Sequence, residues 1–326
     1  MKSNLRRFYQ AIFVLLLLLV AGGAQAQTWP NRPLHIRVGW APGGATDILA
    51  RVLAQKLQES YGVSVVVENR PGAAGGVDAA ALAKSAFDDH TLMMVPPGVQ
   101  SINQFLYKTL GYDPENDFVA VGLVAQIPNA LAVHASTRLV SFKELIDYAK
   151  ANPNKMNYAS AGVGTTGHLL NELLKTRIGI QVTHVPYKGN GPALQALLAR
   201  EVDFNTDGNP QLLQQIRAGK LRALAVSSDK RWVQLPDVPT FAELGYPELT
   251  MQVWYGLVAQ AKMPREIIAR VNKDVNAILA QPEMVKRLRE LNLEALPGSP
   301  EDMAALVRRE RARWKGVVEA SGARVD

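Results

Sequence analysis

The stretch GWAPGGATD, residues 39–47, lies between the apolar run LHIRV at 34–38 and the amphipathic run ILARVLAQKL at 48–57. An apolar run, a glycine-bearing loop and a helix start in this order predict a strand–loop–helix unit. The first N–H groups of a helix lack intrahelical acceptors, and the helix dipole favours negative charge there. We therefore expect this stretch to hold an anion.

A second stretch has the same construction about midway along the chain. The run MNYAS at 156–160 predicts a strand, AGVGTTGH at 161–168 a glycine loop, and LLNELLKTRIG at 169–179 a helix. One chain therefore has two loops suited to an anion. If they belong to different domains, they can face each other across a cleft.

The whole chain alternates between strand and helix patterns, which predicts an α/β fold with parallel, doubly wound sheets. Two long helical patterns follow at 265–291 and 299–321, the second with Ser299 as N-cap and Asp302 completing a capping box. The predicted strands are 34–40, 63–69, 91–95, 121–127, 130–134, 156–160, 182–187, 221–228 and 251–259.

Residues 1–26 have the pattern of a secretory signal peptide, with basic residues before the apolar run 11–20 and AQA at 24–26. The alternative is an N-terminal membrane anchor, but the run is shorter than the roughly 20 residues that a spanning helix needs. We expect cleavage after Ala26 and an exported protein. The chain has no cysteine, so disulfides do not stabilise it.

The charge and the motifs argue against several function classes. Removing the leader lowers the formal net charge from +7 to +4, and the only basic run, RRERAR at 308–313, reads as a solvated helix face. We therefore expect no nucleic-acid partner. The pattern GVGTTG at 162–167 matches a dinucleotide fingerprint, but the next strand, VTHVPYK at 182–188, has no acid to hold a ribose. We expect no cofactor.

Catalytic and metal-binding motifs are also missing. The sequence has no P-loop and no G-x-S-x-G, and its one S-x-x-K, at 227–230, lacks the companion motifs of a penicillin-binding site. No two of the five histidines are spaced as metal ligands. We expect no catalytic residue and no metal site. His168, in the first turn after the second glycine loop, is either a structural histidine or part of a ligand site.

Eight segments in fixed order resemble the substrate-binding proteins of the tripartite tricarboxylate transporter family, also called the Bordetella uptake gene family. The resemblance extends from Trp29 to near the C-terminus. The segments are TWPNRPLHIRVGWAPGGATD, VVVENRPGAAGG, LYKTLGYDPENDF, NYASAGVGTTGH, VPYKGNGPAL, AGKLRALAVSS, LPDVPTFAELGYP and WYGLVAQ.

The resemblance implies a type II periplasmic binding protein fold with two lobes, two crossover strands and a ligand cleft between the lobes. Residues 27–125 plus 252–326 would form lobe 1, and residues 126–251 lobe 2, with hinges near VAQIP and QVWYG. The protein would bind a small carboxylate, deliver it to integral-membrane transporter subunits and act as a monomer.

The resemblance also implies which residues bind the ligand. Backbone of Pro42, Gly43, Gly44 and Ala45 would hold the carboxylate from lobe 1, and Ser160, Gly162, Gly164, Thr165 and Thr166 from lobe 2. Asp47 matches the family's acidic position and would cap the helix. Distal specificity would come from Pro97, Gly98, Tyr187, Lys188 and Asp207, the last followed by Gly208 and Asn209.

Two of these residues have two interpretations that the sequence leaves open. Trp40 replaces the usual phenylalanine and either faces an aromatic carboxylate or packs in the core. Tyr187 either contacts the ligand or packs at the hinge. Asp207 would accept a hydrogen bond from a hydroxyl or an amine but would repel a second carboxylate.

Two other function classes remain open from the sequence: a periplasmic sensor that uses the same closed form, and an exported hydrolase. The sequence does not rank aliphatic di- or tricarboxylates, acidic amino acids and aromatic acids as ligands.

Overall fold

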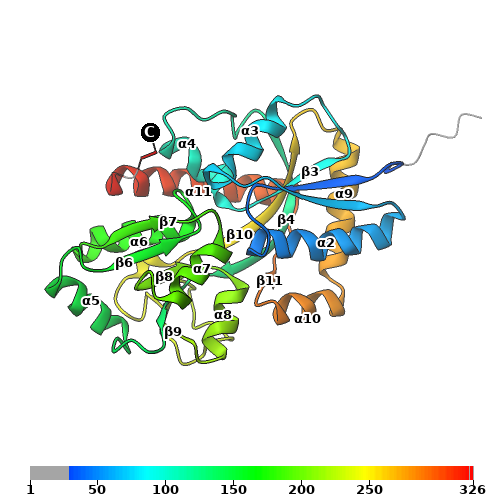
Figure 1. The fold of residues 1–326 in the computed structure, drawn as a ribbon. Coiled ribbons are helices and arrows are strands. Elements are labelled where there is room, and N and C mark those ends of the chain that lie inside the picture. Colours follow the sequence, from blue (N-terminus) through cyan, green and yellow to red (C-terminus); the bar gives the residue numbers. More distant parts are fainter. Residues whose placement is uncertain (1–28, 323, 326) are drawn as a thin grey trace, which may run out of the picture.

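The computed structural model describes residues 29–322, 324 and 325 of the 326-residue chain. The predicted signal peptide, residues 1–26, lies outside the described residues. The fold has two lobes, each built on one β-sheet with helices packed on it (Figure 1). We name them the six-stranded lobe and the five-stranded lobe.

The six-stranded lobe has the strand order β11-β4-β10-β3-β1-β2. Its strands are β1 (Leu34–Val38), β2 (Val65–Asn69), β3 (Thr91–Val95), β4 (Phe118–Pro128), β10 (Gln252–Gln260) and β11 (Glu294–Ala295). Its helices are α2 (Ala45–Tyr61), η1 (Ala73–Gly75), α3 (Gly76–Lys84), η2 (Gly98–Ile102), α4 (Asn103–Leu106), α9 (Arg265–Leu279), α10 (Pro282–Glu290) and α11 (Pro300–Ser321).

The five-stranded lobe has the strand order β7-β6-β8-β5-β9. Its strands are β5 (Ala130–His134), β6 (Asn157–Ser160), β7 (Thr183–Pro186), β8 (Phe204–Asp207) and β9 (Leu221–Val226). Its helices are α5 (Phe142–Ala151), α6 (Thr166–Ile178), α7 (Asn190–Ala199) and α8 (Pro210–Arg217), and the turn η3 (Pro247–Leu249) precedes the return to β10.

Helix α2 shows how the sequence pattern produces the packing. Leu49, Leu53 and Leu57 are fully buried and recur every fourth residue, so they form one apolar face against the sheet. Gly62 ends the helix because it adopts a left-handed φ of 69°, which costs glycine little. Because the apolar face fixes α2 on the sheet, the glycine loop 39–44 at the start of the helix is held at the edge of the six-stranded lobe that faces the five-stranded lobe.

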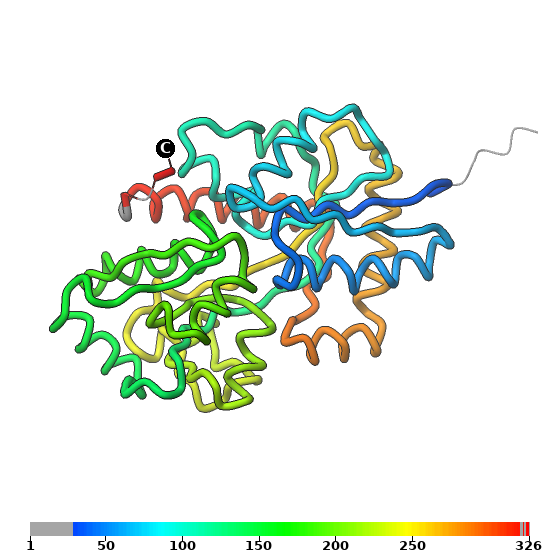
Figure 2. The backbone as a smooth tube through the Cα atoms, viewed as in Figure 1, coloured from blue at the N-terminus to red at the C-terminus, as the bar shows by residue number. Residues whose placement is uncertain are grey.

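Two segments cross between the lobes, and both can be followed in Figure 2. Strand β4 leads through Asn129 into β5, and Met251 leads from the five-stranded lobe into β10. Strands β4 and β10 pair antiparallel, and β10 is also antiparallel to β3. The prediction of parallel sheets is therefore wrong for these strands and for β5, which is antiparallel to β8 and β9. The reason is the direction of chain entry. Strands β10 and β5 each enter their sheet from the other lobe, so they run antiparallel to the strands beside them.

Of the two helices predicted near the C-terminus, one is confirmed and the other is wrong in its extent. The capping box of Ser299 and Asp302 is confirmed, and Gly322 ends α11 with a φ of 65°. The pattern at 265–291 was predicted as one helix, but Gln281–Pro282 separates α9 from α10. Proline has no N–H to continue the first helix, yet it suits the first position of a new one.

The apolar core forms two clusters. Trp314 and Val317, on the C-terminal half of α11, pack into the core of the five-stranded lobe together with Ile102 and Leu106. Helix α11 therefore stabilises both lobes, since it also packs along β4. Within the described part of the chain, no helix combines the length and the apolar character that crossing a membrane requires.

Candidate functional site

A small cavity of about 40 Å³ lies between the two lobes. The six-stranded lobe, the five-stranded lobe and the crossover strand β10 all contribute to its wall. The lining residues are Trp40, Thr46, Ala74, Pro96, Pro97 and Gly98; Ala161, Thr165, Thr166, Asn190, Asp207 and Gly208; and Val253 and Tyr255. Polar and apolar surface contribute about equally to the wall, so the cavity offers a small molecule both packing and hydrogen-bonding partners.

The lobes contact each other around this cavity. A Cβ built on Gly44 would lie 3.1 Å from Asn190 Oδ1 of the opposite lobe, and one built on Gly164 would lie 2.6 Å from Leu106 Cδ1. The described structure is therefore a closed form. In this form the glycine loop after β1 and the glycine loop after β6 meet the other lobe at close range.

The first loop, residues 39–44, is held in shape by Asp47. Its carboxylate accepts hydrogen bonds from Gly43 N at 2.9 Å, Asn69 Nδ2 at 2.9 Å and Arg51 Nε at 3.0 Å. Burial alone would raise the pKa of Asp47, but the hydrogen bonds from Arg51, Gly43 and Asn69 hold it below its ordinary value. Asp47 therefore braces the loop, and the N–H of Gly43 is committed to it.

The next N–H groups along the chain remain available. Gly44, the N-cap of α2, receives no side-chain cap, and the N–H groups of Gly44, Ala45, Thr46 and Asp47 have no acceptor among the described residues. All four residues are buried. Buried N–H groups are almost always paired, so this helix start is built to meet an acceptor that the chain itself does not supply.

The second loop, residues 161–165, commits the N–H groups of its glycines internally. Gly162 N donates to Ser160 Oγ at 3.1 Å, and Gly164 N donates to His168 Nδ1 at 3.2 Å. Thr165 caps α6, because its hydroxyl accepts from His168 N. The predicted donors Gly162 and Gly164 therefore shape the loop in this closed form.

The N–H groups that remain available near the second loop are those of the next two residues in the chain. The N–H groups of Thr166 and Gly167 open α6, are buried and have no acceptor among the described residues. Thr165 and Thr166 also line the cavity. Two helix starts, one from each lobe, therefore bring uncommitted donors to the cavity, and each carries a partial positive charge.

A stack of aromatic rings supports the second loop from behind. The ring centroids of His168 and His184 are 4.2 Å apart, and those of His184 and Tyr158 are 4.8 Å apart. His184 Nε2 also meets Ser160 Oγ at 2.6 Å. Burial lowers the pKa of His168 to about 4 and that of His184 to about 3, the latter with the help of the neighbouring His168. Both imidazoles are therefore neutral near pH 7.

We expect the protein to lose stability as the pH falls from 7 to 5. An unfolded histidine has a pKa of about 6.5, so between the two values the unfolded chain binds more protons than the folded one. The buried His168 contributes a loss of up to about 1.4 kcal/mol per pH unit. Urea unfolding at pH 7, 6 and 5 measures this loss.

A variant of His184 tests whether the loss of stability at low pH comes from the stacked histidines. His184→Phe keeps an aromatic ring but cannot be protonated, so its stability is expected to fall less between pH 7 and 5. Asp207 opposes the trend, because its raised pKa favours the folded state at low pH. Equal slopes for wild type and variant would contradict a role of His184.

The Ser160–His184 contact also bears on the hydrolase alternative. Neither residue lines the cavity, and a histidine with a pKa of about 3 is a poor proton acceptor near neutral pH. Ser160 is buried, and its hydroxyl also contacts the Gly162 carbonyl. The pair supports the loop, and the arrangement gives the hydrolase alternative no support.

Asp207 is the acidic residue of the cavity. It ends β8, is 9% exposed, and both its oxygens accept from Asn190 Nδ2 at 2.6 Å. Burial raises its pKa to about 6, although the hydrogen bonds from Asn190 and the Gly208 backbone lower it. Tyr255 also lines the cavity, and its hydroxyl lies 3.4 Å from the Gly208 carbonyl oxygen.

A second, wider hollow of about 280 Å³ adjoins the cavity. The two share Trp40, Ala74 and Ala161, so the indole of Trp40 forms part of both walls. Trp40 is 6% exposed and packs over Gly75, where an added Cβ would lie 2.4 Å from the ring. Trp40 thus belongs to the core and also borders the cleft.

The predicted site residues fall into three groups. Trp40, Pro97, Gly98, Thr165, Thr166 and Asp207 line the cavity. Gly162, Tyr187 and Lys188 line the second hollow, where Lys188 is exposed. Pro42, Gly43, Gly44, Ala45, Asp47, Ser160, Gly164 and His168 line neither.

Sequence reasoning missed several lining residues. Asn190 directly follows the quoted segment VPYKG, and Tyr255 lies in a predicted hinge strand, so their positions could have drawn attention to both. Thr46 adjoins a predicted residue. Ala74, Pro96, Ala161 and Val253 are apolar and gave no signal of their own.

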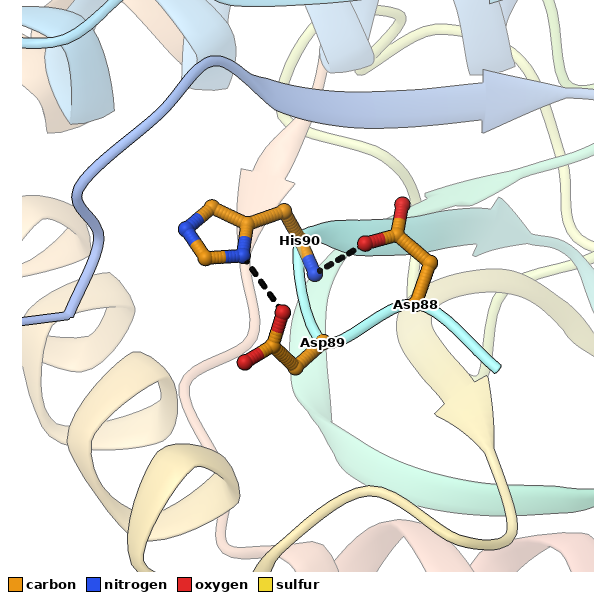
Figure 3. A group of neighbouring side chains, drawn as sticks. All are labelled: Asp88, Asp89 and His90. Carbon is orange, nitrogen blue, oxygen red and sulfur yellow. Dashed lines mark hydrogen bonds and ion pairs between the residues drawn. The ribbon is translucent and has the colours of Figure 1, made fainter. Parts of the chain in front are cut away.

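One group among the described residues could offer three metal ligands: Asp88, Asp89 and His90 (Figure 3). His90 Nδ1 contacts Asp89 at 2.6 Å, and Asp88 accepts from the His90 backbone. Arg32 Nη2 already pairs with both carboxylates, at 2.5 and 2.9 Å. The cluster thus holds a cationic side chain of the protein and lies outside the cavity.

Comparison with known proteins gives consistent matches over nearly the whole chain. The model of the tripartite tricarboxylate transporter family receptor matches residues 49–323. The chain is 36% identical to the protein BugT of Bordetella pertussis over 307 residues, which cover 94% of both chains.

Solved structures agree. The structure of Rpa4515 from R. palustris with adipate is 39% identical, covers 91% of this chain and 100% of its own, and has a TM-score of 0.88. That of MatC from Rhodopseudomonas palustris with bound malate is 32% identical, covers 89% and 100%, and has a TM-score of 0.84.

Proposed function

Because the chain belongs to the tripartite tricarboxylate transporter family of receptors, we propose that it is a periplasmic solute-binding protein. It captures one small carboxylate between its lobes and delivers it to membrane subunits of a tripartite transporter. A leader cleaved after Ala26 exports it to the periplasm.

The observation that carries this proposal is the pair of helix starts at the cavity. Among the described residues, four buried N–H groups at the start of α2 and two at the start of α6 have no acceptor, and Thr46 and Thr166 bring these two helix starts to the cavity wall. No lysine, arginine or histidine is among the described residues that line the cavity, so we take these dipoles as its positive groups. A carboxylate supplies the acceptors that both helix starts lack, and related proteins bind adipate and malate.

Binding is proposed to couple to closure because the donors come from different lobes. One helix start belongs to the six-stranded lobe and the other to the five-stranded lobe, so a carboxylate bound to both helix starts stabilises the closed form over the open one. The closed form is what the membrane subunits recognise.

Thermal unfolding of residues 27–326 with a panel of carboxylates tests the proposal. A ligand at about 100 times its dissociation constant adds about 2.7 kcal/mol of stability, which is visible as a rise in Tm. The amide of each acid is the control, because it keeps the skeleton and removes the negative charge. A rise with an acid but not with its amide is expected. Equal rises with both would contradict an anion site.

A further inference from the structure

The cavity holds a buried carboxylate, that of Asp207, which has no positive partner among the described residues. Of the described residues that line it, Asp207 is the only one that carries a charge at neutral pH. Its oxygens accept from the neutral amide of Asn190. A buried charge is costly unless it is paired, so the chain retains Asp207 here without supplying the usual compensation.

In the part of the chain that the structure describes, the elements packed around Asp207 carry cationic side chains, but none pairs with Asp207. Glu172 pairs with Lys175, and Arg217 donates to Asn292. His168 is neutral near pH 7, because burial lowers its pKa to about 4. Besides Asp207, the titratable side chains on β5, β6, α6, α7, α8 and β10 are His134, Tyr158, His168, Glu172, Lys175, Arg177, Arg217 and Tyr255.

Asp207 still has acceptor capacity for a ligand. An ionised carboxylate has about four lone-pair positions; the Asn190 amide nitrogen meets one at each oxygen and the Gly208 backbone N–H meets a third, which leaves one for a ligand. An ionised ligand group placed there would meet a like charge in a poorly solvated site. A hydroxyl, an ammonium or a carboxyl that keeps its proton would instead donate to Asp207.

We propose that Asp207 selects ligands by requiring a hydrogen-bond donor: the protein binds small monoanionic acids that carry, besides the carboxylate, a hydroxyl, an ammonium or a protonated carboxyl. The inference rests on the proposed function, in which the helix starts hold the ionised carboxylate. It adds that a doubly ionised dicarboxylate is disfavoured, and that a dicarboxylate binds with one end protonated.

The test compares ligands of equal chain length by calorimetry at pH 8.0 and 5.5. For four-, five- and six-carbon chains, the panel contains the diacid, the ω-hydroxy acid, the ω-amino acid and the unsubstituted acid. At pH 8.0, the tightest hydroxy or amino acid is expected to bind at least about 10-fold more tightly than the diacid of its length. The diacid is expected to gain affinity at pH 5.5.

The variant Asp207→Asn keeps the shape of the side chain and removes its charge. It is expected to abolish the preference over the diacid at pH 8.0, because an amide can donate to a second carboxylate. Asp203→Asn is the matched control: Asp203 is exposed, immediately precedes β8 and lies outside the cavity. It should keep the wild-type preference.

The outcomes separate this inference from the proposed function. If diacids bind as tightly as hydroxy and amino acids at pH 8.0 in the wild type, the inference is wrong and the receptor function stands. The wild-type comparison decides this even if Asp207→Asn does not fold. If no acid binds at either pH, the proposed function fails, and the inference fails with it.

Discussion

Replacing Gly44 by aspartate is expected to weaken ligand binding by about 100-fold or more while the protein remains folded. Gly44 is the N-cap of α2 and has φ −80° and ψ 169°, a conformation open to any residue. An N-cap aspartate accepts from the second or third N–H of its helix, so its carboxylate would occupy donors proposed for the ligand. Losing two charge-assisted hydrogen bonds, at about 1.5–3 kcal/mol each, accounts for the expected loss.

A graded series at Gly44 separates this cause from steric effects. Gly44→Ala adds a Cβ that lies 3.1 Å from the flexible Asn190 side chain, so we expect a loss below about 10-fold. Gly44→Asn caps the helix without charge and should fall between. Calorimetry gives the affinities, and Tm should change little, since aspartate suits a helix start. Wild-type affinity in Gly44→Asp would exclude the α2 donors from the site.

Gly164 is less suited to this test. Its φ is 85°, and an added Cβ would strike Leu106 of the other lobe. A substitution there would strain the loop and obstruct closure, so lost binding would not identify an anion site.

Replacing Gly167 by alanine is expected to destabilise the protein by about 3 kcal/mol, the upper part of the usual range for overpacking. An added Cβ would lie 2.0 Å from the Thr206 carbonyl oxygen, which belongs to the central strand β8. Backbone cannot rotate away as a side chain can, so α6 must move off the sheet. Thr165 and Thr166 would move with it, and ligand affinity should fall too.

Gly316→Ala is the matched control, because Gly316 is also helical but has open space around it. The same substitution there should raise stability by about 0.5–1 kcal/mol, as alanine replaces glycine in a helix. Urea unfolding measures both variants. A Gly167→Ala variant as stable as wild type would show that α6 and β8 do not pack as closely as described.

Part of this site could be predicted from the sequence alone. The order of strand, glycine loop and helix predicted both helix starts, because a helix leaves its first N–H groups without partners whatever its surroundings. Ser299 and Asp302 predicted the start of α11 for the same local reason, and the segments quoted above indicated the family.

Strand β8 shows where the pattern failed. Its sequence FNTD lacks the apolar run that marks a central strand, and no strand was predicted there. The structure buries all four residues: Thr206 donates to Asn171, and Asp207 accepts from Asn190. Both partners lie on helices distant in sequence, so neighbouring residues gave no sign that Thr206 and Asp207 would find hydrogen-bond partners.

The sequence by itself thus determined the α/β class, the two anion-suited helix starts and the family, because these depend on local backbone geometry and on the order of segments. Only the tertiary structure decided which donors remain available. Gly43 N is committed to Asp47 and Gly164 N to His168, through contacts that exist only in the folded loops. Closure of the lobes then places Asp207 in the cavity without a cation, since burial and pairing are set by residues far apart in the chain.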